Sequence, residues 1–148
     1  MKKNLTLPAV IVMLILVSCQ SADKKIPQIA GDFCNCFSSL EKNLSEKTKG
    51  IIDRAANSAN PEQSMKDDVE KLTEEEKMSV GTEMVSLGDM ENKDSDLGKC
   101  MEAVKNKYNN ARTFNEKKFL EKMVKELDSR GGCSFTADLL QIGLKTKD

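Results

Sequence analysis

The 148-residue chain contains no histidine and no tryptophan, and it has only one tyrosine. Histidine is the usual general base, the usual nitrogen ligand of zinc and a partner in Ser-His and Cys-His catalytic pairs. Its absence removes these enzyme and metal classes, and the sequence offers no catalytic residue in their place. The chain also lacks a basic excess, because its formal net charge is −1. This balance argues against nucleic-acid binding and gives no polybasic help for membrane attachment.

A long apolar run is missing as well. A transmembrane helix needs about 20 apolar residues, and the apolar segment near the N-terminus covers only residues 5–17. It follows Lys2 and Lys3 and is closed by the polar stretch Ser18-Cys19-Gln20-Ser21. A basic start, a short apolar middle and a small-residue end are typical of a secretory signal peptide. Residues 1–18 are therefore predicted to direct export.

The ending Leu16-Val17-Ser18-Cys19 resembles the lipobox of bacterial lipoproteins. In that family the cysteine thiol is joined to a diacylglycerol, the preceding peptide is removed, and the new amine is usually acylated, for example with palmitate. The resemblance implies that Cys19 is the lipidation site and anchors the mature chain in a membrane. Because Gln20 stands where an Asp would favour the inner membrane, it also implies the outer membrane of a Gram-negative bacterium. The alternative is an ordinary cleaved signal, or an uncleaved anchor, in which Cys19 plays no part.

The remaining sequence is predicted to be helical. Apolar residues recur at three- and four-residue spacing, and no segment shows sustained period-two alternation. The first predicted helix begins at residue 28 and continues to about residue 55. The later helices are expected over residues 61–72, 73–87, 97–108, 113–127 and 134–144. We therefore expect an all-α, compact bundle of five or six helices over residues 28–148, with residues 19–27 as an acylated tether.

Two capping boxes refine this prediction. Thr73 with Glu76, and Thr113 with Glu116, have the spacing at which a Thr side chain and an acid cap the start of a helix reciprocally. Within 73–87, a helix is expected to run on through Met78, Met84, Val85 and Leu87. The methionines of the chain are mostly at apolar stripe positions, so core filling is their expected role.

Four cysteines remain beside Cys19, namely Cys34, Cys36, Cys100 and Cys133. An even number of cysteines in an exported chain predicts disulfides. Successive helical residues are turned by about 100°, so Cys34 and Cys36 point about 200° apart and cannot easily bond each other. They are expected to tie their helix to two others. The sequence leaves open whether the pairs are 34–100 with 36–133, or 34–133 with 36–100.

Two other roles for these cysteines are less consistent with their spacing. Redox chemistry at Cys34-Asn35-Cys36 would use a C-x-C pair, whereas the usual redox motif is C-x-x-C in a βαβ context. Zinc sites usually pair cysteines two to four residues apart in two knuckles, but Cys100 and Cys133 are isolated.

A calcium-binding loop beginning at Asp94 is also not supported, because the sequence lacks the Gly and Glu that such a loop requires. We therefore expect no metal and no cofactor.

Three functions remain after these exclusions. The first is a non-enzymatic, lipid-anchored protein of the cell envelope that binds a protein partner through a helical face. The second is a small carrier that encloses a lipid or another apolar ligand. The third, an envelope thiol-disulfide enzyme, would require a free thiol at Cys34 or Cys36. An exposed apolar surface would favour the first function, and an enclosed apolar pocket would favour the second.

Overall fold

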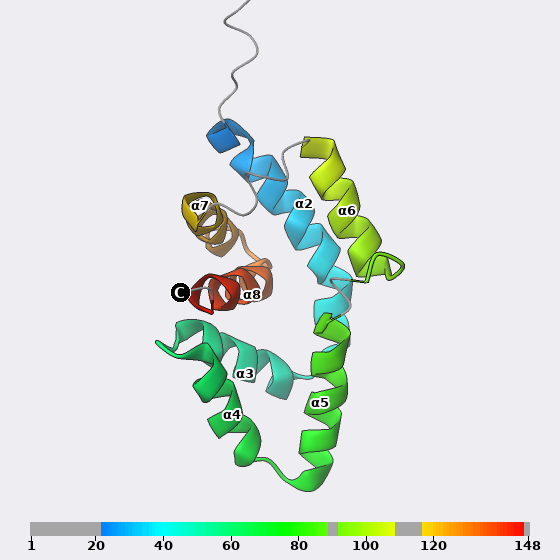
Figure 1. The fold of residues 1–148 in the computed structure, drawn as a ribbon, viewed down its shortest axis with the longest axis vertical. Coiled ribbons are helices and arrows are strands. Elements are labelled where there is room, and N and C mark those ends of the chain that lie inside the picture. The colour runs from blue at the N-terminus through cyan, green and yellow to red at the C-terminus, as the bar shows by residue number, and fades with distance from the viewer. Residues whose placement is uncertain (1–21, 89–91, 109–116, 147–148) are drawn as a thin grey trace, which may run out of the picture.

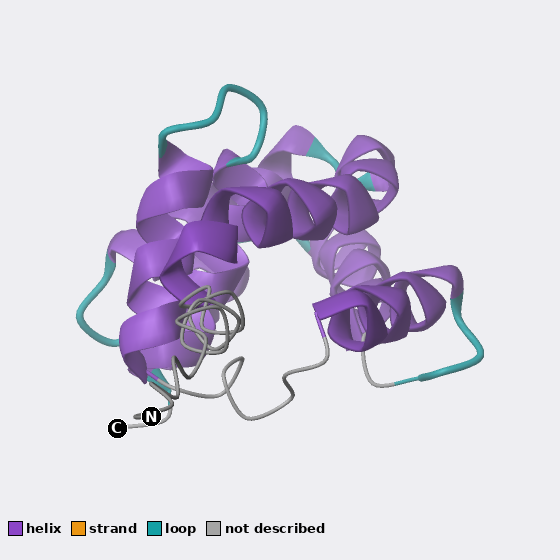
Figure 2. Cartoon of the chain, turned by 90° about the horizontal axis from the view of Figure 1, so that it is seen from above, coloured by secondary structure: helices purple, strands orange, loops and turns teal. Residues whose placement is uncertain are grey.

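The computed structural model describes residues 22–88, 92–108 and 117–146. Within these ranges the chain forms seven helices and no strand, so the predicted all-α fold is confirmed (Figure 2). The predicted signal peptide, the lipidation candidate Cys19 and the Thr113–Glu116 capping box lie outside the described residues.

The single helix expected from residue 28 to about residue 55 is divided into two helices. This division explains why the described residues form seven helices, whereas five or six were expected. Helix α2 (Ala22–Asn43) ends before Leu44, and α3 (Glu46–Asn57) begins after it. Leu44 turns into the core, and Ser45 caps α3 by accepting a hydrogen bond from the Thr48 backbone N–H at 3.3 Å. A serine cap satisfies one of the amide groups that a helix start leaves unpaired. The chain therefore changes direction at this point.

Helix α2 also begins at Ala22, so residues 22–27 are its first turns and not part of an extended tether. Ile26 is buried together with Ile29, and burial of an isoleucine stabilises the fold by about 1.5–3 kcal/mol. Pro27 removes one helical hydrogen bond here. The Pro27 carbonyl accepts a hydrogen bond from Nη2 of Arg130 at 2.6 Å, which holds this turn against the end of a distant helix.

The remaining helices are α4 (Pro61–Glu70), α5 (Glu74–Gly88), α6 (Asp96–Tyr108), α7 (Lys117–Asp128) and α8 (Ser134–Lys145). Helix α2 packs against α6 on one side and α7 on the other (Figure 1). Helix α7 packs on α8, and α8 packs on α3. Helices α4 and α5 both contact α3 and form the end of the molecule farthest from the start of α2. We call residues 61–88 the α4–α5 arm.

The core lies where α2, α3, α7 and α8 meet. Its buried side chains include Phe33 and Phe37 of α2, Met123 and Leu127 of α7, and Phe135 at the start of α8. Helix α7 shows the cleanest apolar face, as its sequence spacing predicts. In the described part of the chain, no helix combines the length and the apolar character needed to cross a bilayer.

The α4–α5 arm contributes little to this core, and the core-filling role expected of Met78 is wrong. Met84 and Leu87 pack against the core and Val80 is buried. Met78 and Val85, however, are 76% and 74% exposed. At 100° per residue, these two side chains lie on the side of α5 opposite Val80. Helix α5 is therefore apolar on both sides, although only one side is covered.

Candidate functional site

The four cysteines are joined in two disulfides that both start from α2. Cys34 bonds Cys133, just before α8, and Cys36 bonds Cys100 in α6, with Cα–Cα separations of 5.5 and 5.7 Å. This is the second of the two pairings that the sequence left open. Because Cys34 and Cys36 diverge on the helix, each reaches a different neighbour. The bonds place these residues in the structural framework, and a cystine has no thiolate to act as nucleophile or zinc ligand.

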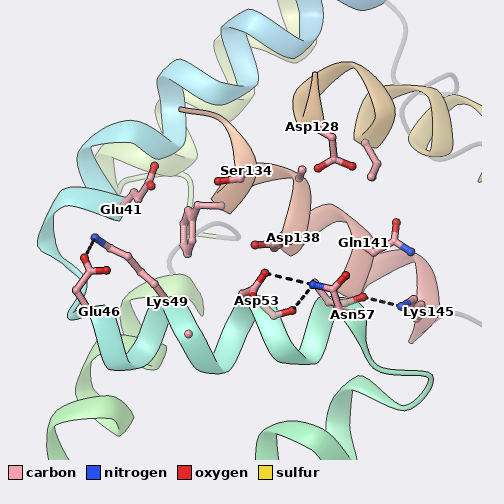
Figure 3. Close-up of a pocket in the computed structure, with 15 residues that line it drawn as sticks. Glu41, Glu46, Lys49, Asp53, Asn57, Asp128, Ser134, Asp138, Gln141 and Lys145 are labelled. Atoms are coloured by element: carbon pink, nitrogen blue, oxygen red, sulfur yellow. Dashed lines mark hydrogen bonds and ion pairs between the residues drawn. The ribbon is translucent and has the colours of Figure 1, made fainter. Parts of the chain in front are cut away.

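A cleft of about 580 Å³ lies between α3 and α8, with one wall extended by the end of α2 and by α7 (Figure 3). It is open to solvent, and most of the side chains around it are charged or polar. Five of them are acidic and come from four helices or their ends: Glu41, Glu46, Asp53, Asp128 and Asp138.

One lysine of the cleft pairs with one of these five acids, and the other contacts backbone carbonyls. Lys49 donates a hydrogen bond to Glu46 at 2.9 Å. Lys145 donates to the backbone carbonyls of Ala56 and Ser58 at 2.6 and 2.8 Å. These carbonyls belong to the end of α3, where a cation is favoured because helical carbonyls are left unpaired there. Lys145 therefore ties α8 to α3 instead of compensating the acids.

Asp138 is the most perturbed of these acids. Burial, followed by the negative charges of Asp53 and Asp128, raises the pKa of the Asp138 carboxyl to about 6. Both causes disfavour the ionised form. The cleft can therefore attract positively charged groups and take up a proton slightly below neutral pH. Among the described residues, no group of acids or cysteines is arranged to hold a metal ion.

The second surface of interest is the outer side of α5. Met78 and Val85 are separated by seven residues, so they lie on one face about 10 Å apart along the helix axis. Gly81 and Thr82 lie between them and are exposed, as are Glu74 and Glu75 one turn before Met78. The result is a narrow apolar face with an acidic end.

The opposite side of α5 is fastened to α3. Glu83 accepts hydrogen bonds from the backbone N–H and the hydroxyl of Ser45, both at 2.9 Å. Glu76 pairs with Lys47. Hydrogen bonds from Lys47 and from Thr73 lower the pKa of Glu76 to about 2. These polar contacts fix the orientation of α5, so Met78 and Val85 are held facing solvent.

The disulfide cysteines were identified from the sequence, but the α3–α8 cleft and the apolar face of α5 were not. Asp53, Asp128 and Asp138 are far apart in a sequence with 24 acidic residues, and only the packing of α3, α7 and α8 brings them together. The seven-residue spacing of Met78 and Val85 was a usable signal, since it places both on one face. No comparable spacing in the sequence indicates the contact between Glu83 and Ser45.

No family model matches this chain, and no curated protein or solved structure is similar enough to count as a match.

Proposed function

We propose that this chain is a lipid-anchored helical protein of the bacterial cell envelope, attached through Cys19 to the outer membrane, and that it binds a protein partner without acting as an enzyme. The lipobox resemblance of residues 16–19 supports the anchor. The two disulfides support an oxidising compartment, because disulfides persist in the periplasm and at cell surfaces and are rare in the cytosol.

The observation that carries the binding function is the exposure of Met78 and Val85 on one face of α5. Large apolar side chains gathered on one exposed face mark interaction surfaces more often than single exposed ones do. The spacing suits insertion of a helix face into a groove, where anchors recur one and two turns apart. The acidic end at Glu74 and Glu75 favours a partner whose apolar groove is bordered by lysine or arginine.

The two alternative functions have less support. A carrier of apolar ligands needs an enclosed apolar cavity, whereas the α3–α8 cleft is open and lined mostly by charged and polar groups. A thiol-disulfide enzyme needs a reactive thiolate, and the structure pairs Cys34, Cys36, Cys100 and Cys133 in cystines.

Site-specific photo-crosslinking in the native envelope tests the binding surface. A photoreactive amino acid would replace Met78, Val85 or, as a control, Asn106, which is exposed on α6. We expect the same protein to be crosslinked from positions 78 and 85 and not from position 106. A Met78→Ser/Val85→Ser double variant should lose that partner while keeping the unfolding midpoint of the parent chain. Identical products from all three positions, or none from 78 and 85, would refute the proposed surface.

The anchor is tested separately by mass spectrometry of the protein isolated from its own envelope. We expect the mature chain to begin at residue 19 with acyl chains attached, and the Cys19→Ala variant to lack them and to leave the membrane fraction. A chain that carries no lipid at this position would contradict the anchor.

A further inference from the structure

The start of α2 must lie close to the proposed anchor. Only Gln20 and Ser21 separate Cys19 from Ala22, the first residue of α2. At a maximum of about 3.5 Å per residue, the Cα atom of Ala22 can be no more than roughly 11 Å from that of the lipidated residue. Because α2 is a continuous helix up to Asn43, the whole folded domain is held to the membrane by this short connection. One end of the molecule therefore faces the bilayer.

The end that faces the bilayer also contains the end of α6. The hydroxyl of Tyr108 and Nζ of Lys107 donate hydrogen bonds to Asp32 of α2 at 2.7 and 2.6 Å. Cys36, one turn further along α2, is bonded to Cys100 near the start of α6. The two helices are therefore antiparallel, and the last turn of α6 lies beside the first turns of α2 (Figure 1). Helix α7 also packs against α2, and Arg130, which follows the C-terminal end of α7, contacts Pro27.

Two helix ends in this region carry pairs of lysines. The pairs are Lys24 and Lys25 in the first turn of α2, and Lys105 and Lys107 in the last turn of α6. Three of these four lysines are exposed, and Lys25 is half-buried. Asp32 offsets one charge by pairing with Lys107.

The α4–α5 arm has the opposite character. It contains eight acids and three lysines, and Glu62, Glu70, Glu74 and Glu75 are among its exposed side chains. The near-zero net charge of the sequence therefore conceals a separation along the molecule. The lysine-bearing end is next to the proposed anchor, and the acidic arm is at the far end (Figure 1).

We propose that the lysine-bearing end formed by the start of α2 and the end of α6 binds the anionic phospholipid headgroups of the membrane that holds the anchor. This inference rests on the proposed lipidation of Cys19. Attraction between basic side chains and an anionic surface falls off within a Debye length, about 8–10 Å at physiological salt. The short connection holds the start of α2 within such a distance, so the lysines act at high effective concentration. The result is a fixed orientation, with the α4–α5 arm and the face of Met78 and Val85 pointing away from the bilayer.

Lysine acetylation on vesicles tests this orientation with internal controls. The lipidated full chain would be added to vesicles of phosphatidylcholine alone, or of phosphatidylcholine with phosphatidylglycerol, and treated with a water-soluble acetylating reagent. Mass spectrometry would then give the rate at each lysine. We expect Lys24 and Lys105 to react several-fold more slowly on the anionic vesicles, and this protection to disappear at high salt. Lys66 and Lys71 of the α4–α5 arm should react equally on both.

Flotation of the same samples separates the two proposals. A chain that floats with both kinds of vesicle, but whose Lys24 and Lys105 react equally on both, would overturn the headgroup contact and leave the anchor intact. A chain that does not float on neutral vesicles would overturn the anchor and this inference with it. If Lys66 and Lys71 were protected as strongly as Lys24 and Lys105, the proposed orientation would also be overturned, because the α4–α5 arm would then lie at the membrane surface.

Discussion

Asp138 is held where its negative charge is unfavourable. Its carboxyl lies in the α3–α8 cleft near Asp53 and Asp128, while Lys49 and Lys145 are engaged by other groups. Its pKa of about 6 in the folded chain is above the usual 3.8. The folded state therefore binds more protons than the unfolded state between about pH 4 and pH 6. The contribution of Asp138 to stability decreases as the pH rises through this window.

Asp138→Asn should stabilise the protein at pH 7 and have little effect near pH 4. A pKa raised by about two pH units corresponds to about 3 kcal/mol of lost stability. Solvent screening in an open cleft reduces the gain expected from the substitution to about 1 kcal/mol. Urea unfolding at both pH values, with the disulfides intact, measures the difference. Glu121→Gln on the exposed side of α7 is the control and should change stability little at either pH. An equal effect of Asp138→Asn at pH 4 and pH 7 would contradict this electrostatic origin.

For single residues, the sequence identifies those whose chemical role can be inferred without knowing how the helices pack. The disulfide role of Cys34, Cys36, Cys100 and Cys133 followed from their even number and from the divergence of the first two on a helix. The raised pKa of Asp138 did not follow, because it depends on burial and on neighbours from other helices.

Polar contacts join α5 to the junction between α2 and α3. Ser45 caps α3 and donates two hydrogen bonds to Glu83 of α5. Hydrogen bonds from Thr48 and then Ser45 lower the pKa of Glu83, against the opposing effect of burial. A carboxylate at this position is also favoured by the dipole of α3. One serine therefore begins α3 and fastens the α4–α5 arm to it.

Ser45→Ala should destabilise the protein by about 1 kcal/mol, the usual cost of losing a helix N-cap. Because the lowered pKa of Glu83 contributes stability that is lost as the pH falls below its usual value of 4.5, the cost of Ser45→Ala should shrink in acid. Thermal unfolding at pH 7 and at pH 3.5 (roughly one unit below that value) measures both effects. Ser86→Ala on α5 replaces a serine by a better helix former and should cost nothing. A loss no larger than that of Ser86→Ala would show that the joint contributes little.

Periodicity and capping signals predicted most of the elements. The Thr73–Glu76 capping box is present, since the Thr73 N–H donates to Glu76 at 2.9 Å and the Glu76 N–H to the Thr73 hydroxyl at 3.3 Å. The break at Leu44 was missed because the apolar stripe continues through it. The core-filling role expected of Met78 was wrong because α5 is apolar on two sides, and sequence periodicity does not say which side is covered.

For the whole molecule, α2 is the central element. It lies between α6 and α7, and its two disulfides close sequence separations of 64 and 99 residues. A helical bundle with disulfide bracing could be predicted because composition and cysteine number determine it. The order of packing and the position of the α4–α5 arm could not, because they depend on contacts between residues distant in the sequence.

The two disulfides should stabilise different parts of this arrangement. Loop-closure entropy assigns each of them at most about 4–5 kcal/mol, so their removal should lower global stability by similar amounts. Their local effects should differ. Helix α8 packs against both α7 and α3, whereas α6 packs mainly against α2. Apart from Cys36–Cys100, α6 has the Asp32 contacts of Lys107 and Tyr108 to hold it.

Hydrogen exchange under native conditions distinguishes these effects. In a Cys36→Ser/Cys100→Ser variant, α6 should exchange faster than α2, α7 and α8, because it packs mainly against α2 and can open while the other helices stay together. In a Cys34→Ser/Cys133→Ser variant, α6 should keep its protection relative to the other helices, since α8 stays packed and only global unfolding becomes easier. If α6 exchanges as slowly as α2 in the first variant, then side-chain packing alone holds α6 to the core, and the Cys36–Cys100 bond is not what joins them.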